Sequence, residues 1–239
     1  MAVDLPAPDE RESRILILWE RAVGLPRRRR DDELSRDCGA PRSLGERNRR
    51  LLVLRGALFG RSWPLTSDCP ACATACELAV DCSALIDSLD ALVPPPAGGR
   101  FEWNGQPIAI RAPTVDDLSG IAGHEDIAGA AAALLARCVQ SDLDLSQLAA
   151  EDLETLEGRI ESLDPAAAIS FAVNCPACGH SWSAPVDVAD ALWMELQRAA
   201  ELALTDVDAL ARAYGWSEDQ VMGLSPVRRA AYLQLAAAP

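Results

Sequence analysis

Two short cysteine motifs organise this chain, and they are near copies of each other. The first reads Cys69-Pro70-Ala71-Cys72, then seven residues, then Val80-Asp81; the second reads Cys175-Pro176-Ala177-Cys178, then seven residues, then Val186-Asp187. A two-residue spacer lets one turn offer two sulfurs to one ion, and zinc prefers four sulfurs in tetrahedral geometry. The sequence therefore predicts one structural zinc ion (Zn2+) bound by Cys69, Cys72, Cys175 and Cys178 in a small β unit.

The repeat also separates these four cysteines from two others. At the offset of 106 residues that relates the motifs, Cys76 aligns with Trp182 and Cys82 aligns with Val188. Both positions are apolar in the second copy. A free cysteine behaves as a small hydrophobic residue when it is buried. We therefore expect Cys76 and Cys82 to be buried side chains and not metal ligands.

Two alternatives to a four-thiolate site stay open. A redox dithiol of the Cys-x-x-Cys type usually begins a helix in a βαβ setting, whereas here an alternating strand pattern follows each motif. Two disulfides would suit a secreted chain, but the polar, acidic N-terminus does not have the pattern of a secretory signal. His180 is the one rival ligand, and Cys38 and Cys138 stand alone.

The composition indicates an acidic protein, and the lack of a secretory-signal pattern and of a long apolar run fits a cytoplasmic location. The 239 residues carry a net charge of −14, and all 22 basic residues are arginine. No apolar run approaches the ~18 residues of a membrane span, so we expect no membrane span. In a reducing compartment, pairs of thiols more often bind metal than form disulfides.

Helix and strand patterns predict a mainly α protein with a small β zinc-ribbon-like unit, an α+β fold. If both motifs share one ion, the residues between them form an α-rich insertion, with a hairpin turn at Asn104-Gly105 and a helix that Thr114 caps. Closing so long a loop costs chain entropy, which metal binding offsets. The predicted regions are a disordered tail at 1–12, an N-terminal helical region at 13–62, the zinc-ribbon-like unit at 63–82 and 166–188, the insertion at 83–165 and a C-terminal helical region at 189–239.

The C-terminal region is predicted to be helical and to bind a partner. Separate helices are expected over about 189–203 and 207–214, and Ser217 with Gln220 forms a capping box for a third. Residues 205–224 have the length of a helix-turn-helix, a DNA-binding motif. Acidic residues there oppose contact with phosphates, which argues against nucleic acid as a partner. The residues expected to bind a partner protein are Trp216, Arg228, Arg229 and Tyr232.

The sequence shows no catalytic constellation, and we expect no enzyme. It contains no phosphate-binding loop, no Gly-x-Gly-x-x-Gly and no nucleophile elbow. A closed four-thiolate zinc site also leaves no open position for chemistry. His124, beside Glu125 and Asp126, belongs either to a site or to a solvated loop, and the loop is the simpler interpretation. The basic run Arg27–Arg30 is interpreted as a solvated face beside the acidic residues that follow it.

Four stretches in a fixed order carry a family resemblance. They are Leu44-Gly45-Glu46-Arg47 with the leucine-rich segment that leads to Gly60; the first cysteine motif with Glu77-Leu78; Arg111-Ala112-Pro113-Thr114 with Asp117-Leu118 and residues 134–139; and Tyr214-Gly215-Trp216-Ser217-Glu218 with Arg228-Arg229 and Tyr232-Leu233. In this combination the chain resembles a family of baseplate proteins from contractile-tailed phages and phage-like contractile injection systems. That family is related to phage baseplate-hub assembly proteins.

The resemblance implies a non-enzymatic role in building a contractile tail or injection machine. The protein would be a baseplate component or a chaperone for hub assembly, and its partners would be other baseplate and tail proteins. The chain departs from the family pattern at Ala73, where glycine is usual, and at Cys76. The first zinc-binding turn is therefore expected to be less regular than the second. The alternatives from other classes are a zinc-dependent DNA-binding regulator and an enzyme that uses His124.

Overall fold

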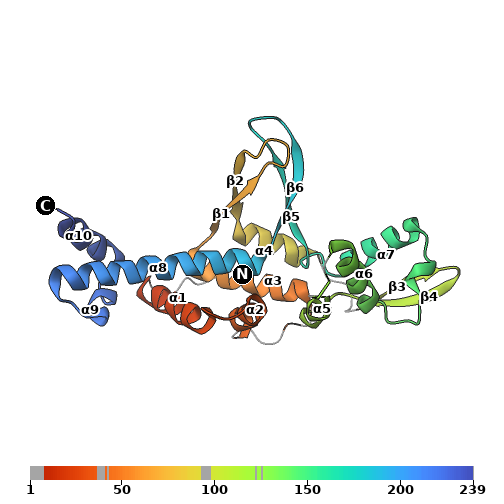
Figure 1. Ribbon diagram of the computed structural model, residues 1–239, viewed down its shortest axis with the longest axis horizontal. Coiled ribbons are helices and arrows are strands. Elements are labelled where there is room, and N and C mark those ends of the chain that lie inside the picture. The colour runs from red at the N-terminus through yellow and green to blue at the C-terminus, as the bar shows by residue number, and fades with distance from the viewer. Residues whose placement is uncertain are drawn as a thin grey trace.

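The computed structural model of the chain is an elongated helical body from which two β-hairpins project (Figure 1). It describes residues 8–36, 41, 43–92, 98–121, 123, 124 and 126–238. The elements are α1 (Pro8–Ala22), α2 (Arg27–Ser35), α3 (Leu44–Phe59), β1 (Ser62–Asp68), β2 (Ala75–Asp81), α4 (Cys82–Ala91), β3 (Gly98–Trp103), β4 (Gln106–Arg111), α5 (Val115–Ile121), α6 (Ile127–Cys138), a short 3-10 turn (Leu145–Gln147), α7 (Ala150–Leu163), β5 (Ile169–Asn174), β6 (Ser181–Val186), α8 (Val188–Tyr214), α9 (Glu218–Met222) and α10 (Pro226–Ala236).

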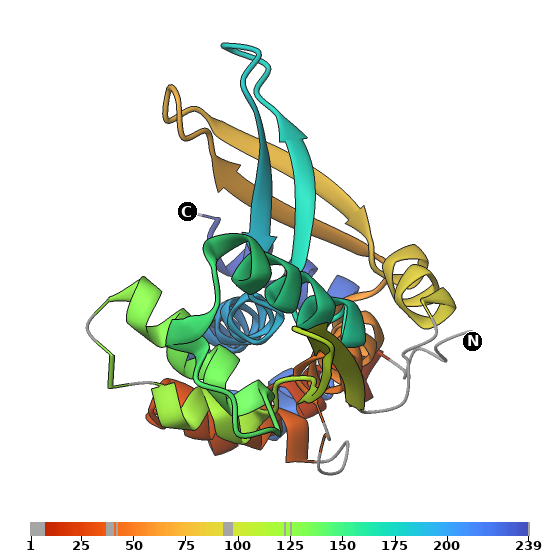
Figure 2. The same cartoon turned by 90° about the vertical axis from the view of Figure 1, so that its right-hand side faces the viewer.

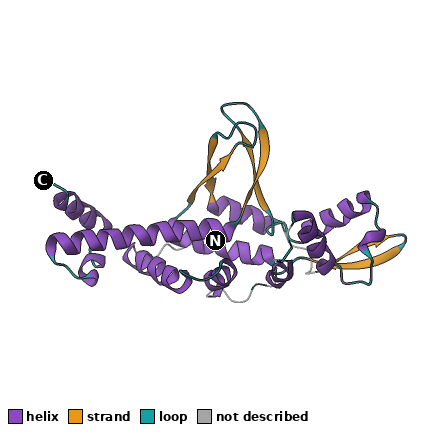
Figure 3. Ribbon diagram, viewed as in Figure 1, coloured by secondary structure: helices purple, strands orange, loops and turns teal. Residues whose placement is uncertain are grey.

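The predicted fold class is confirmed. Helices dominate the described residues, and the strands there form three separate two-stranded antiparallel sheets (Figure 3). Hairpins β1–β2 and β5–β6 rise from the same side of the helical body (Figure 2). Each carries one cysteine motif at its turn, and the residues between the two hairpins form a mainly helical segment with the third hairpin, β3–β4.

The two cysteine-bearing hairpins have the same backbone register. Trp63 pairs with Val80 in the first hairpin, and Ile169 pairs with Val186 in the second. Both members of the second pair lie 106 residues after those of the first, the same offset that relates the cysteine motifs. The sequence repeat is therefore also a repeat of the β-ladder, and it brings equivalent side chains to equivalent places.

An aspartate ends each of these hairpins and begins the helix that follows. Asp81 accepts hydrogen bonds from two backbone amides at the start of α4, and Asp187 accepts one from the amide of Asp190 in α8. Such caps satisfy amides that have no partner within the helix. The two helices then differ greatly in length, with 10 residues in α4 and 27 in α8.

The main hydrophobic core lies where α1, α3 and α8 meet the bases of both hairpins. Trp63 of β1 and Leu192 of α8 are 1% and 0% exposed, and Leu51 and Leu52 of α3 are fully buried beside them. Burying an apolar side chain of this size contributes about 1.5–3 kcal/mol. This core therefore fixes the hairpins to the helical body.

The insertion has a separate core. Phe101 of β3, Ile110 of β4 and Leu156 of α7 are buried in it, where α7 packs against the β3–β4 hairpin. Asn104 and Gly105 have φ angles of 50° and 74° at the hairpin turn. Positive φ at both central residues is what a two-residue hairpin turn requires, so this prediction is confirmed.

The predicted cap at Thr114 is also confirmed, because its hydroxyl accepts from the backbone amide of Asp117 at 3.4 Å. An arginine reinforces it. The backbone amide and the hydroxyl of Thr114 both donate to the Asp117 carboxylate at 2.8 Å. Arg111 donates to both oxygens of the same carboxylate, at 2.5 and 2.9 Å. The Arg111 hydrogen bonds, followed by those from Thr114, hold the pKa of Asp117 well below its usual range.

The first helix begins earlier than predicted. α1 starts at Pro8, inside the range 1–12 that was expected to be a disordered tail, while residues 1–7 lie outside the described residues. Glu12 supplies the physical reason, because both its carboxylate oxygens accept hydrogen bonds at 2.5 Å from the guanidinium of Arg229. A partner 217 residues away stabilises this turn, and no local pattern reveals it.

The predicted break between helices near residue 205 is wrong, because α8 is continuous from Val188 to Tyr214. The Thr205 hydroxyl donates to the Glu201 carbonyl at 2.7 Å, a bond that a helix accommodates. Asp206 lies 3.4 Å from Arg229 on α10. These contacts outweigh the weak helix propensity of Thr-Asp, and the helix ends only where Gly215 has a φ of 70°.

Candidate metal centre

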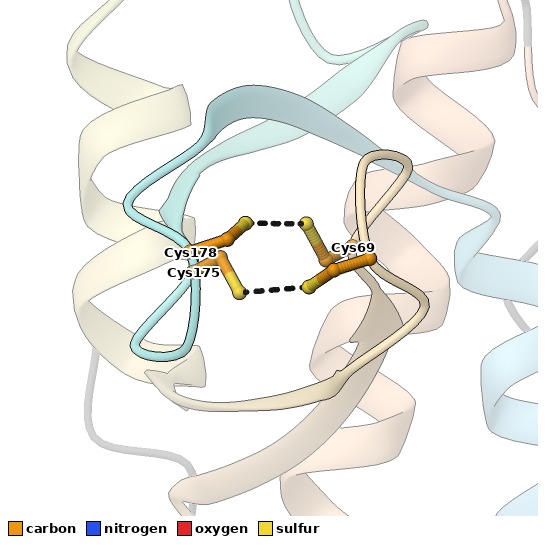
Figure 4. A group of neighbouring side chains, drawn as sticks. Cys69, Cys175 and Cys178 are labelled. Carbon is orange, nitrogen blue, oxygen red and sulfur yellow. Dashed lines mark hydrogen bonds between the residues drawn. The ribbon is translucent and has the colours of Figure 1, made fainter.

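The four predicted ligands meet at the tips of the two hairpins. The Sγ atoms of Cys69, Cys72, Cys175 and Cys178 all lie within 4.8 Å of one another. Across the gap, Cys69 lies 3.6 Å from Cys178, and Cys72 lies 3.6 Å from Cys175 (Figure 4). Four sulfurs around an ion at about 2.3 Å are separated by roughly 3.8 Å, so the spacing suits a tetrahedral site. The cluster can hold a metal ion.

The two knuckles are built by the same backbone hydrogen bonds. In the first, the amide of Ala73 donates to the Cys69 carbonyl at 2.8 Å; in the second, the amide of Gly179 donates to the Cys175 carbonyl at 2.9 Å. The residue after the second cysteine has positive φ in both, 57° at Ala73 and 73° at Gly179. Alanine therefore adopts the conformation that favours glycine. Both turns have the same form, although only the second has glycine at the positive-φ position.

The repulsion among the four sulfurs favours binding of a cation. Backbone amides, that of Cys178 first, donate to the Cys175 sulfur and lower the pKa of Cys175 to about 6. The amide of His180 acts to lower the pKa of Cys178, but the neighbouring sulfurs, Cys72 first among them, raise it to about 12. Thiolates this close repel one another, and a bound cation removes that penalty. A metal ion would therefore let all four sulfurs ionise together.

The other cysteines that the structure describes lie outside the four-sulfur group. Cys76 is 4% exposed and packs in the small core beneath the knuckles, and Cys82 is 1% exposed in the main core. Their predicted burial is confirmed. Burial is the first cause of the raised pKa of both thiols. Cys138 is buried in the core of the insertion, and Cys38 lies outside the described residues.

His180 is not part of the sulfur cluster. Its ring stacks on Trp182 with the centroids 6.1 Å apart, and its carbonyl accepts a hydrogen bond from the Cys175 amide at 2.8 Å. The residue thus shapes the second knuckle through its backbone. His124 is exposed, as expected for a solvated loop, while Glu125 lies outside the described residues.

Two buried polar contacts join the first half of the chain to the second, and sequence patterns missed both. Arg55 of α3 is 1% exposed and donates to both carboxylate oxygens of Glu195 on α8, at 2.9 and 2.7 Å. The backbone amide of Gly45 donates to the Asp164 carboxylate at 2.7 Å. A side chain at position 45 would occupy the space of that carboxylate. Gly45 stands within the motif Leu44-Gly45-Glu46-Arg47, the one signal that points to it.

The predicted partner-binding residues divide into two groups. Trp216 and Tyr232 form an aromatic cluster with Tyr214, with ring centroids 4.7 to 5.8 Å apart. Arg228 is exposed. Arg229, in contrast, is 3% exposed, and its guanidinium is occupied by Glu12 and Asp206. Arg229 therefore links helices within the molecule and is not available to a partner in this structure.

The arginine run on α2 is not simply a solvated face. Arg27 binds Asp187 at 2.6 Å, and Arg30 binds Asp190 at 3.0 Å and lies over the ring of Trp193. The helical period of α2 turns these two arginines toward α8, because positions three apart share a face. The expectation of a solvated face is therefore corrected: Arg27 and Arg30 make tertiary contacts, and the other two arginines of the run are exposed.

Comparison with known proteins adds no assignment to this geometry. No family model, no curated protein and no solved structure matches the chain. Among the described residues, no helix is long and apolar enough to cross a membrane.

Proposed function

We propose that the chain is a non-enzymatic, zinc-stabilised protein-interaction component of the baseplate of a contractile tail or injection system. It would act as a structural part or as a chaperone of hub assembly, and its partners would be other baseplate and tail proteins. The family resemblance supports a contractile tail or injection system as the machine in which the chain acts. The arrangement of the cysteine cluster and of the C-terminal helices supports a structural, protein-binding role.

The donor set supports a structural zinc ion. Four cysteine sulfurs from two Cys-x-x-Cys turns are the ligands that zinc takes in closed structural sites, and such sites keep no position for a water or substrate. The ligands come from hairpins 106 residues apart in the chain. One ion bound to both would act as a staple between them, which is a folding role and not a catalytic one.

The observation that carries the interaction role is the orientation of α10. This helix buries Arg229, at 3% exposed, and presents Val227 and Leu235 to solvent, at 81% and 65% exposed. An ordinary surface helix buries its apolar side chains and exposes its charged ones. A buried charge and outward apolar side chains are the informative departures from normal surface composition. Together with the partly exposed aromatics Trp216 and Tyr232, they indicate a surface that binds another protein.

The test is fractionation of a producer lysate on a density gradient, with the protein detected by antibody. Wild-type chain is expected with assembled tail particles if it is a baseplate part, or with free tail proteins if it is a chaperone. The double variant Val227→Glu/Leu235→Glu should lose both associations. Ile127→Glu is the matched control, because Ile127 is 90% exposed but lies on α6 in the insertion.

Two results would overturn the proposal. One is wild-type protein that associates with no tail component. The other is salt-sensitive binding to duplex DNA that is lost when Arg228 is reversed in charge, which would establish the zinc-dependent regulator instead. Far-ultraviolet circular dichroism and zinc content of each variant exclude unfolding as the cause of lost association.

A further inference from the structure

A trough lies between α2, the start of α3 and the start of α5. It consists of two cavities, of about 900 Å³ and about 520 Å³. The cavities have five lining residues in common and are therefore one continuous depression, which we call the α2–α5 trough. The shared residues are Arg29, Asp32, Arg47, Val115 and Asp116.

Arg47 is the unusual group in this trough. It is 9% exposed and lines both cavities. One terminal nitrogen donates to the Asn48 side chain at 3.2 Å, and the other lies 4.0 Å from the Asp31 carboxylate. Its Nε has no hydrogen-bond partner among the residues that the structure describes. A buried guanidinium with an unpaired donor has lost its hydration without replacing it. An acceptor brought by a ligand would complete its hydrogen bonding.

The arginine run of α2 contributes to the same trough. Whereas Arg27 and Arg30 bind aspartates on α8, Arg28 and Arg29 are exposed and line the smaller cavity. Neither of the latter two forms an ion pair with another described residue. They add two positive charges to the trough that Arg47 lines. The two arginines of the run Arg27–Arg30 that do not bind α8 therefore belong to this surface.

The acidic residues of the trough decide which anion fits. Glu33 is already neutralised by ion pairs with two arginines. Asp32 and Asp116 have no ion pair with any described residue, and they share the wall with Arg47. A free phosphate would be repelled by these carboxylates. An extended peptide can place one carboxylate at the arginine and its own amide or basic groups at the two aspartates.

We propose that the α2–α5 trough binds an extended peptide segment of a partner protein that carries one acidic side chain, whose carboxylate accepts from Arg47. The size of the two cavities suits several residues, and Leu25, Val115 and Leu118 offer apolar contacts along the wall. A charge-assisted hydrogen bond of this kind is among the stronger polar contacts available to a protein. This surface is separate from α10, and the inference does not depend on membership of a contractile tail.

Binding of labelled hexapeptides to the purified full chain tests the inference. The probes are pools with one position fixed as Glu, Gln, Lys or phosphoserine, measured by fluorescence anisotropy. We expect the best Glu pool to bind at least tenfold more tightly than the matching Gln pool. Arg47→Gln should weaken that binding at least tenfold.

Because Arg47 is buried, a second variant guards against a folding effect. Arg29→Glu on the exposed wall should also weaken binding at least tenfold, while Arg198→Glu, the same charge change on an exposed part of α8, should bind like wild type. Equal binding of the Glu and Gln pools would overturn the proposal. So would a preference for phosphoserine with equal competition by inorganic phosphate, which would identify a phosphate site instead.

Discussion

The two hairpin units of this molecule share a backbone and differ in what extends from it. Their strands pair in the same register, and their knuckles close with the same hydrogen bonds. The first unit has Ala73 at the positive φ position where the second has Gly179, and α4 stops after 10 residues where α8 continues for 27. The parts that face the four sulfurs are therefore alike, while the parts beyond them have diverged.

The difference teaches that the cysteine cluster constrains the geometry of the two hairpins more tightly than it constrains their sequences. Most strand positions differ between the copies, as at Cys76 and Trp182, yet the ladder does not shift by a residue. A shift of one residue would turn every inward side chain outward and separate the sulfurs. The helices that follow the hairpins are not held to one register in this way. α4 leads to the insertion, and α8 runs along the long axis of the body (Figure 1).

Removing one ligand tests the equivalence of the two units most severely. Cys175→Ser is expected to abolish binding of the metal ion and to separate the hairpins, because three sulfurs do not complete a closed site. Structural zinc in small peptides contributes about 10–16 kcal/mol, which is an upper bound for the loss here. Elemental analysis and thermal unfolding would measure both effects.

The matched controls use the other cysteines. Cys69→Ser should lose the metal as completely as Cys175→Ser does, since the knuckles are equivalent in geometry. Cys76→Ala should keep one ion per chain, because Cys76 lies in the small core and outside the four-sulfur group. A single ion retained in either serine variant would show that the knuckles do not share it.

The next largest effect concerns the buried contact between α3 and the end of α7, the elements that precede the two hairpin units. In Gly45→Ala the added carbon would lie 1.7 Å from an Asp164 oxygen, so the carboxylate must move and release the Gly45 amide. We expect a loss of about 3 kcal/mol in the free energy of unfolding. Gly158→Ala on α7 is the control, because nothing lies within 4 Å of the added carbon. It should gain about 0.5–1 kcal/mol, and urea unfolding measures both.

A titration at Asp31 tests the packing of α2 against α3 and α8, the helix that follows the second hairpin unit. Asp31 lies between Arg30 and Arg47, at 3.9 and 4.0 Å, and burial raises its pKa to about 6. Its unfolded value is about 3.9, so the folded state binds the extra proton and stability falls as pH rises from about 4 to about 6. Asp31→Asn should remove a penalty of about 2 kcal/mol at pH 7 and none at pH 3.

Chemical denaturation at several pH values checks this. The depressed pKa of Asp117 has the opposite sign, because its stabilisation is present above the unfolded pKa and is lost as pH falls. It acts equally in wild type and variant and cancels in the difference. A difference between the two proteins that does not change between pH 3 and pH 7 would contradict the assigned burial of Asp31.

The smallest predicted effect compares the knuckles directly. Ala73→Gly should stabilise the first knuckle and Gly179→Ala should destabilise the second, each by about 1 kcal/mol, because alanine is strained at positive φ. Thermal unfolding of the metal-loaded protein measures both shifts. Changes of the same sign in the two variants would mean that the knuckles differ in backbone conformation.

The local parts of this structure could be predicted from the sequence, and the distant contacts could not. The repeat identified the four cysteines, and turn chemistry identified the Asn104-Gly105 hairpin and the cap at Thr114. The sequence predicts Arg229 on a binding surface, because its burial depends on Glu12, which lies 217 residues away and leaves no local signal. The continuity of α8 through Thr205 depends in the same way on a helix that comes later in the chain. Proximity of this kind leaves no periodic mark in a sequence.

The spacing of the two knuckles also sets an order of events during synthesis. The second knuckle leaves the ribosome 106 residues after the first, a delay of roughly 5–20 s at about 5–20 residues per second. Through that interval the nascent chain displays a half-site of two thiols that cannot close around an ion. A metal ion held by all four sulfurs can therefore be bound only after the second knuckle has emerged.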